Sequence, residues 1–254
     1  MRTYTETTFE CKRDNLTIRG SEYRPEGDNL PVAICCHGFI SCQDRVRQYA
    51  KTFAEEGYAA YCFDFCGGSA PGTSRSDGKT TEMSVLTEIE DLEAVIKYVK
   101  SLSYVSDTLI LQGSSQGGFV AGLTAAKHQG LAEKLIMIYP ALCIPDDARA
   151  GSMRAASFDP EHIPEEFDCG PMRLGRCYPE AVNKMNAIEE VAKYEGPVLL
   201  IHGTADEIVP IDYSKRANEM MTESELVIIE GGAHGFAPEH DEIAIETIRN
   251  FIKK

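Results

Sequence analysis

Hydrophobic and polar positions follow two different periods along this chain. Residues 7–13 and 16–23 alternate apolar and polar side chains on either side of the turn sequence RDN, a pattern typical of an antiparallel hairpin. Short apolar runs then recur through the chain, and we expect each to form a buried strand. These runs are 32–36, 58–65, 108–112, 134–140, 197–202 and 225–230.

Segments with helical spacing separate these runs. The clearest is 84–102, which is predicted to place one apolar face inward. That face consists of Leu86, Ile89, Leu92, Val95, Ile96 and Val99. Further helices are expected at 44–57, 116–128, 212–222 and 239–253. Short apolar strands that alternate with helices predict an α/β fold, with a mostly parallel sheet covered by helices on both faces.

Residues 141–193 break this alternation. They contain five prolines, several glycines and little periodicity. A long irregular segment inside a compact domain is typically a functional insertion. We therefore expect a core made of residues 1–140 and 194–254, and a small lid of residues 141–193 that follows the sixth strand counted from the hairpin.

The composition argues against several classes of function. A net charge of −15 leaves little to neutralise phosphates, so nucleic acid is not an expected partner. No run reaches the ~18 apolar residues of a membrane span, and the first residues lack the apolar segment of a secretion signal. The nine cysteines have no zinc-like spacing and fit small buried hydrophobes in a reducing cytosol. We expect a cytoplasmic protein with no metal, cofactor or membrane partner.

The sequence LILQGSSQGGFVAGL, residues 109–123, predicts a nucleophilic serine. Such a serine stands on a sharp turn between a strand and a helix, and glycines two positions to either side relieve collisions there. Ser115 has Gly113 and Gly117 at these positions, whereas a frame centred on Ser114 would meet glutamine on both sides. The flanking apolar run and small-residue helix supply the required context, so Ser115 is the predicted nucleophile.

A serine nucleophile needs a base, and the base needs an orienting acid, in the chain order serine, acid, histidine. Asp206 follows the penultimate predicted strand, and His234 lies in a glycine-rich loop after the last one. Asp212 is better explained as a first-turn helix residue, and His240 as a solvated residue at the start of the terminal helix. His202 is expected to end its strand and pack there.

Two backbone N–H groups are needed to stabilise the oxyanion that forms during attack. One should belong to Gln116, directly after the serine. The other should come from the loop after the strand 32–36, where the sequence HGF places Phe39. His37 in the same loop is expected to hold the turn and not to take part in chemistry.

With these residues in place, the sequence resembles the α/β-hydrolase superfamily over nearly its whole length, and within it the bacterial feruloyl (cinnamoyl) esterases. The motifs that carry the resemblance are CCHGF, FDF followed by GG, SDGKTTEMSVLTEIEDLEAVIKYV, GSSQGG, FDPEHIPEEF, PVLLIHGTADEIVP and GGAHGF. The family triad falls on Ser115, Asp206 and His234. Ser114 stands where histidine is common and Cys66 where arginine is common, and both departures bear on substrate preference.

The resemblance further implies that residues 141–193 cover the serine and help to hold an aromatic acid. Asp147 matches a position whose carboxylate accepts the phenolic hydroxyl in relatives, while its neighbour Asp146 is an alternative. Both acids also fit a solvated loop with no binding role.

The function expected from these observations is a serine carboxylic ester hydrolase that cleaves hydroxycinnamate esters through an acyl-enzyme. Its partner would be a small aromatic ester, and the relatives suggest a homodimer. A general short-chain carboxylesterase or an acyl-peptide hydrolase-like enzyme are alternatives, although the latter usually carries a large amino-terminal propeller. A non-catalytic binding protein on the same scaffold is a third hypothesis, which the complete triad argues against.

Overall fold

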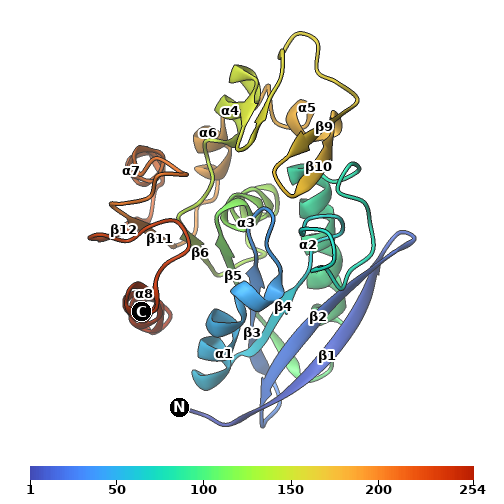
Figure 1. Cartoon of the computed structure of the whole chain (residues 1–254). Helices are drawn as coiled ribbons and strands as arrows, with labels where there is room; N and C mark the ends of the chain where they lie inside the picture. Colours follow the sequence, from blue (N-terminus) through green and yellow to red (C-terminus); the bar gives the residue numbers. More distant parts are fainter.

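An eight-stranded sheet runs through the computed structural model, which describes residues 1–254 (Figure 1). Its strands are β1 (Tyr4–Arg13), β2 (Leu16–Pro25), β3 (Leu30–Cys36), β4 (Ala59–Phe63), β5 (Val105–Ser114), β6 (Lys134–Ile138), β11 (Val198–Gly203) and β12 (Ser224–Ile229). Their spatial order is β1-β2-β4-β3-β5-β6-β11-β12. The predicted mostly parallel sheet is confirmed.

The first two strands form the predicted hairpin, with an antiparallel register that runs from Arg13 opposite Leu16 to Tyr4 opposite Pro25. Strand β2 is also antiparallel to β4, and the remaining pairs are parallel. Strands β3 and β5 lie at the centre of the sheet, so both are paired on each side. The turns that follow β3 and β5 are therefore fixed by their neighbours.

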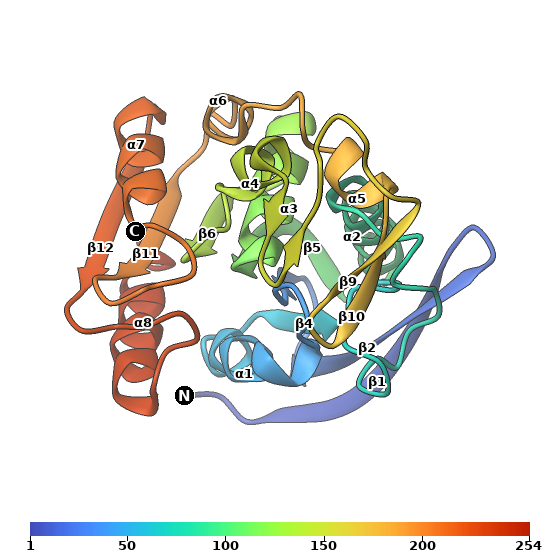
Figure 2. The same ribbon diagram turned by 45° about the horizontal axis from the view of Figure 1, so that its top comes forward.

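Helices cover both faces of the sheet (Figures 1 and 2). They are η1 (Gln43–Arg45), α1 (Arg47–Glu55), α2 (Val85–Lys100), α3 (Gln116–Lys127), α7 (Asp212–Met220) and α8 (Pro238–Phe251). Side chains from α2 and α3 belong to one cluster of 49 buried residues, whereas those from α1 and α8 belong to a second cluster of 22. Neighbouring residues of β3 alternate between the two clusters, as a strand buried on both faces requires. No helix has the length and the apolar character needed to cross a lipid bilayer.

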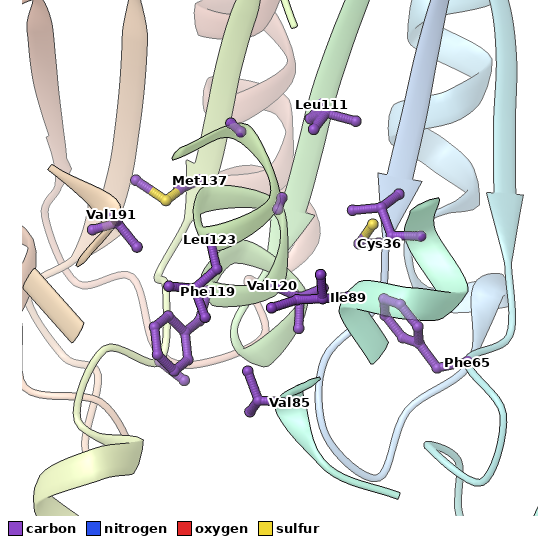
Figure 3. Close-up of a cluster of buried hydrophobic side chains, with 14 of the residues drawn as sticks. Cys36, Phe65, Val85, Ile89, Leu111, Phe119, Val120, Leu123, Met137 and Val191 are labelled. Carbon is purple, nitrogen blue, oxygen red and sulfur yellow. The ribbon is translucent and has the colours of Figure 1, made fainter. Parts of the chain in front are cut away.

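The larger cluster joins α2 and α3 to the sheet. Figure 3 shows Ile89 of α2 pointing toward Val120 of α3, and Met137 of β6 lying close to Val191. At fully buried apolar positions such as these, each side chain is worth about 1.5–3 kcal/mol relative to exposure.

Helix α2 departs from its prediction at Leu86, which is 43% exposed. The buried stripe instead includes two acids, Glu88 and Asp91. Asp91 accepts hydrogen bonds from the Arg13 guanidinium at 2.5 Å and from the Cys66 N–H at 2.8 Å. Burial raises the pKa of Asp91 to about 6, against the opposing effect of Arg13. The prediction is confirmed for the other five residues of the face and wrong for Leu86, because apolar periodicity does not reveal buried acids whose partners lie elsewhere in the chain.

Residues 141–193 form several short elements instead of the irregular segment expected from the sequence. They are α4 (Ile144–Ala150), β7 (Ser152–Met153), β8 (Ala156–Ser157), β9 (Glu166–Cys169), β10 (Met172–Gly175), α5 (Cys177–Glu180) and α6 (Ala187–Val191). Strands β7 and β8 pair as one small hairpin, and β9 and β10 as another. Strands of two to four residues are too short to show a period in the sequence. Buried side chains of this segment join the same cluster as α2 and α3.

The Arg13–Asp91 pair, which joins the first hairpin to α2, generates a prediction for stability. Replacing Arg13 by methionine leaves a buried carboxylate without its cation, and should lower the free energy of unfolding by about 3 kcal/mol near pH 8. Because the folded pKa of Asp91 already lies above its unfolded value, and loss of Arg13 raises it further, the carboxyl is largely neutral near pH 5 and the loss should be smaller there. Urea unfolding at both pH values measures this.

Arg173→Met is the matched control, because Arg173 and its partner Glu166 are both largely exposed and their pair should contribute little. An equal loss for Arg13→Met at the two pH values would contradict the assigned role of the Asp91 charge.

Candidate active site

The turn between β5 and α3 holds Ser115 in a backbone conformation that few non-glycine residues adopt. Its φ is 56° and its ψ is −123°. Its N–H donates to the Ile138 carbonyl at 2.9 Å, and its own carbonyl accepts from the N–H groups of Gly118, Phe119 and Ala141. Such strain persists only where the surroundings over-determine it, and it is common at functional sites. The neighbouring residue Ser114 is buried, with only 5% of its surface exposed to solvent.

The glycines on either side of the serine are required by close approach of the backbone. A Cβ atom on Gly113 would lie 2.1 Å from the Gly117 carbonyl oxygen. A Cβ atom on Gly117 would lie 2.4 Å from the carbonyl oxygens of Cys36 and His37, at the end of β3. The spacing seen in the sequence therefore reflects how tightly α3 packs back against β5 and β3.

The structure brings Ser115, His234 and Asp206 together in hydrogen-bonding order. Each follows a different strand of the sheet: β5, β12 and β11 respectively. His234 Nε2 lies 2.9 Å from Ser115 Oγ, and His234 Nδ1 lies 2.8 Å from Asp206 Oδ2. Because a carboxylate can only accept a hydrogen bond, the hydrogen of a neutral His234 lies on Nδ1 and is donated to Asp206. Nε2 then faces the serine hydroxyl with its lone pair.

Asp206 is held from several directions, with its side chain 1% exposed. Oδ1 accepts from the N–H groups of Ile208 and Val209, each at 2.9 Å. Burial alone would raise the pKa of Asp206, but hydrogen bonds from His202, His234 and the Val209 N–H hold it well below its usual range. The carboxylate therefore remains ionised opposite His234 at any pH near neutrality.

His202 contributes to this arrangement in a way that the sequence analysis missed. It is fully buried at the end of β11, as predicted, but its Nε2 also lies 3.2 Å from Asp206 Oδ2. The same nitrogen is 3.0 Å from the Val209 carbonyl, and Nδ1 is 2.7 Å from Ser214 Oγ. One neutral tautomer fits all of these contacts, with Nε2–H donated and the Ser214 hydroxyl donating to Nδ1. No sequence pattern indicates this contact, because it depends on how the residues after β11 fold back onto His202.

The two competitors for acid and base lie outside the hydrogen-bonded set. Asp212 begins α7, is exposed and pairs with Lys215, as expected of a first-turn residue. His240 lies in α8 with its ring 6.3 Å from that of Phe236. It is half-buried and its Nδ1 is enclosed without a hydrogen-bond partner, so the prediction of a solvated histidine was wrong; its ring packs beside Phe236.

The two predicted oxyanion donors flank the serine. Gln116 is the first residue of α3, so its N–H has no acceptor within the helix. The N–H of Phe39 makes no hydrogen bond in the structure. His37 holds the loop that carries Phe39: its Nδ1 lies 2.8 Å from the Gly38 carbonyl, and its Nε2 accepts from the Phe65 N–H at 3.1 Å. Burial lowers the pKa of His37, which keeps it neutral in this structural role.

A buried polar chain, also missed from the sequence, links the serine turn to residues 141–193. The Gln116 side-chain amide donates to Glu88 Oε2 at 2.7 Å, and the Tyr178 hydroxyl donates to the Gln116 side-chain oxygen. Glu88 comes from α2 and Tyr178 from α5. Burial raises the pKa of Glu88 well above its usual range. Gln116, the residue after Ser115, is thus fixed by both the core and the inserted segment.

Two cavities meet at Ser115, and both are also lined by Phe39 and His234. The first, of about 120 Å³, lies against the inserted segment and is mostly apolar. Its other lining residues are Gln116, Ala141, Cys143, Ile144, Asp147, Met153, Arg154, Tyr178, Ile208 and Val209. The second, of about 270 Å³, is more polar and lies against the segment 38–48 and the loop that carries His234.

The structure separates the two candidate acids of α4. Asp147 is half-buried and lines the apolar cavity, and burial raises its pKa. Asp146 is exposed, accepts from the Tyr213 hydroxyl at one oxygen and pairs with Arg149 at the other. Those two partners hold its pKa below the ordinary value. Only Asp147 therefore lies where a molecule held beside Ser115 would meet it.

Comparison with known proteins agrees with this architecture. The family model described as serine aminopeptidase, S33, matches residues 28–165, which is more than half of the chain, and the model described as TAP-like protein matches residues 171–254. The uncharacterized protein YfhR of Escherichia coli is 28% identical over 248 residues, covering 94% of this chain and 78% of its own. A monoacylglycerol lipase of Mycolicibacterium smegmatis is 21% identical over 220 residues, or 76% of each chain.

Among solved structures, Est1E from Butyrivibrio proteoclasticus with bound ferulic acid superposes with a TM-score of 0.88 at 29% identity. The match covers 97% of this chain and 100% of that one. A second structure of Est1E from the same organism gives a TM-score of 0.86 at 28% identity, covering 96% and 97% of the two chains.

Proposed function

Because this chain belongs to the serine aminopeptidase S33 family of α/β-hydrolases, with Est1E among its similar structures, we propose that it is a serine esterase specific for hydroxycinnamate esters. The observation that carries the proposal is the hydrogen-bonded order of Ser115, His234 and Asp206 at a strained turn. That order is the arrangement by which a neutral histidine activates a serine hydroxyl.

The reaction would proceed in two halves. In the first, Ser115 Oγ bonds to the ester carbonyl carbon while His234 Nε2 takes the hydroxyl proton; the bond to the alcohol oxygen then breaks, and that oxygen receives the proton. In the second, water adds to the acyl-enzyme, His234 takes a proton from it, and the bond to Oγ breaks as the proton returns to Ser115. Asp206 stabilises the imidazolium in both halves.

The oxyanion of each tetrahedral intermediate would be stabilised by the backbone N–H groups of Phe39 and Gln116. Both belong to segments that are held before substrate arrives, one by the His37 contacts and the other by the start of α3. Pre-positioned donors of this kind typically contribute about 2.7–4 kcal/mol each to transition-state stabilisation.

The cavity beside the inserted segment supports an aromatic acyl group. Its walls include the rings of Phe39 and Tyr178, whose centroids lie 5.5 Å apart, and several aliphatic side chains. The Tyr178 hydroxyl donates its hydrogen to Gln116, and the half-buried Asp147 is the only carboxylate that lines the cavity, so Asp147 is the proposed acceptor for a phenolic hydroxyl. The ferulic acid bound in the Est1E structure is a hydroxycinnamic acid, which is the class of acyl group proposed for this cavity.

A general short-chain carboxylesterase is the second candidate, since the same three residues would also cleave alkanoate esters. The similarity to a monoacylglycerol lipase favours this alternative. A cavity that combines aromatic walls with a carboxylate favours the hydroxycinnamates, because an alkyl chain would offer no hydrogen-bond donor to the half-buried Asp147.

The first prediction about activity tests the nucleophile. Ser115→Ala should lower kcat/KM for methyl ferulate by about 10⁴-fold or more, because no other group can form the acyl-enzyme. Ser114→Ala should retain activity within about tenfold, since Ser114 lies beside the turn and not in the hydrogen-bonded order. Initial rates for variants with matched thermal unfolding measure the difference. Similar losses in the two variants would remove the basis for the assignment.

The second prediction tests the acyl cavity. Asp147→Ala should lower kcat/KM roughly tenfold for esters with a free para-hydroxyl, and little for the matching para-methoxy esters, because only the former lose a hydrogen bond to the carboxylate. Asp146→Ala is the control, since Asp146 pairs with Arg149 and Tyr213 instead. Faster turnover of butyrate than of ferulate esters by the wild type would instead identify a general carboxylesterase.

A further inference from the structure

The second cavity beside Ser115 points to the nature of the alcohol, which the acyl cavity leaves open. We propose that this cavity binds the alcohol part of the ester, and that Arg45 selects alcohols that carry a carboxylate. The inference rests on the proposed esterase function and extends it to the other half of the substrate.

The position of the cavity follows the chemistry of the leaving group. His234 Nε2 delivers the proton to the alcohol oxygen, so the alcohol must lie beside the loop that carries His234. Gly235 and Phe236 of that loop line only the second cavity, whereas residues of the inserted segment 141–193 line only the first. An acyl group held against the inserted segment therefore leaves the second cavity for the alcohol. Its remaining lining residues are Gly38, Ser41, Arg45, Val46, Gln48, Ser114, Tyr139 and Asp241.

Arg45 differs from the arginines around it because its guanidinium has no partner. Arg47 and Arg75 both pair with Asp44, while Arg45 forms no ion pair and no side-chain hydrogen bond. In a chain with 40 acidic residues and a net charge of −15, an unpaired guanidinium at the wall of a cavity beside the nucleophile is available to a ligand. Guanidinium groups bind carboxylates in a planar, two-point geometry.

The backbone that carries Arg45 is held in place. Arg45 ends the short helix η1, whose first residue, Gln43, is buried. The Gln43 N–H donates to Asp64 Oδ1 at 2.7 Å, and its side chain accepts from the Ser21 hydroxyl at 2.8 Å. Asp64 also accepts from the Arg75 N–H at 2.8 Å. Arg45 is thus presented from a fixed segment and not from a free loop.

The other charge in the cavity is already engaged. Asp241 accepts from the Tyr49 hydroxyl at 2.6 Å, and burial raises its pKa above the ordinary value. Arg45 is the only arginine or lysine that lines this cavity, and Ser41 and Gln48 add neutral hydrogen-bonding groups. A hydroxylated carboxylic acid, esterified through one of its hydroxyls, fits this combination.

The test uses ester pairs that differ only at the remote charge. Hydroxy acids with two to five carbons between hydroxyl and carboxylate are esterified with ferulate, and each is compared with its neutral carboxamide. A parallel set carries acetate as the acyl group. In the wild-type enzyme kcat/KM should favour the carboxylate in at least one pair by roughly tenfold, as expected for one charge-assisted contact, and Arg45→Gln should remove that preference.

Arg75→Gln is the matched control, because it removes the same charge from an exposed arginine of the neighbouring segment that does not line the cavity. It should leave the preference unchanged. A wild-type enzyme that never favours the carboxylate, or an Arg45→Gln variant that loses activity equally on both members of each pair, would overturn the inference.

The two acyl sets separate this inference from the proposed function. Turnover of the acetates alone would reject the hydroxycinnamate specificity. The role of Arg45 would then be tested within the acetate set, by whether the wild type prefers the carboxylate and Arg45→Gln loses that preference. Turnover of neither set would reject both.

Discussion

The strained backbone of Ser115 is the constraint on which the site depends. It exists because β5 is paired on both sides and α3 packs directly back on β5 and β3, so closely that only glycine fits at positions 113 and 117. The same packing sets the start of α3, and therefore the free N–H of Gln116. Because β3, β11 and β12 are parallel to β5 in one sheet, their following loops bring Phe39, Asp206 and His234 to the same edge.

The pKa values of the two buried acids around this turn, Asp206 and Glu88, are shifted in opposite directions. Asp206 accepts from two backbone N–H groups and two imidazoles, which outweigh the cost of burial and keep it charged. Glu88 accepts from one neutral amide, so burial dominates and raises its pKa. The number and polarity of donors thus decide which carboxyl can stabilise an imidazolium and which only joins the core to the inserted segment.

Much of this arrangement follows from local rules in the sequence. Glycine spacing indicated Ser115, apolar runs located the strands, and strand ends indicated Asp206 and His234. The contacts of His202 with Asp206, and of Glu88 with Gln116, could not be predicted in the same way, because they depend on how separate elements pack and on the burial of polar side chains within apolar stripes. The small hairpins of residues 141–193 could not be predicted, because strands of two to four residues are too short to show the alternation of apolar and polar side chains.

In the proposed mechanism, catalysis passes through an acyl group bound to Ser115. Rapid mixing of enzyme with excess methyl ferulate, acid quenching within the first turnovers and mass spectrometry of the digested protein would measure this directly. A feruloyl adduct is expected on the peptide 101–127, at Ser115, and it should appear before steady state and disappear when substrate is exhausted. Hydrolysis without any adduct under conditions where deacylation is slowed, or an adduct on a different residue, would contradict it.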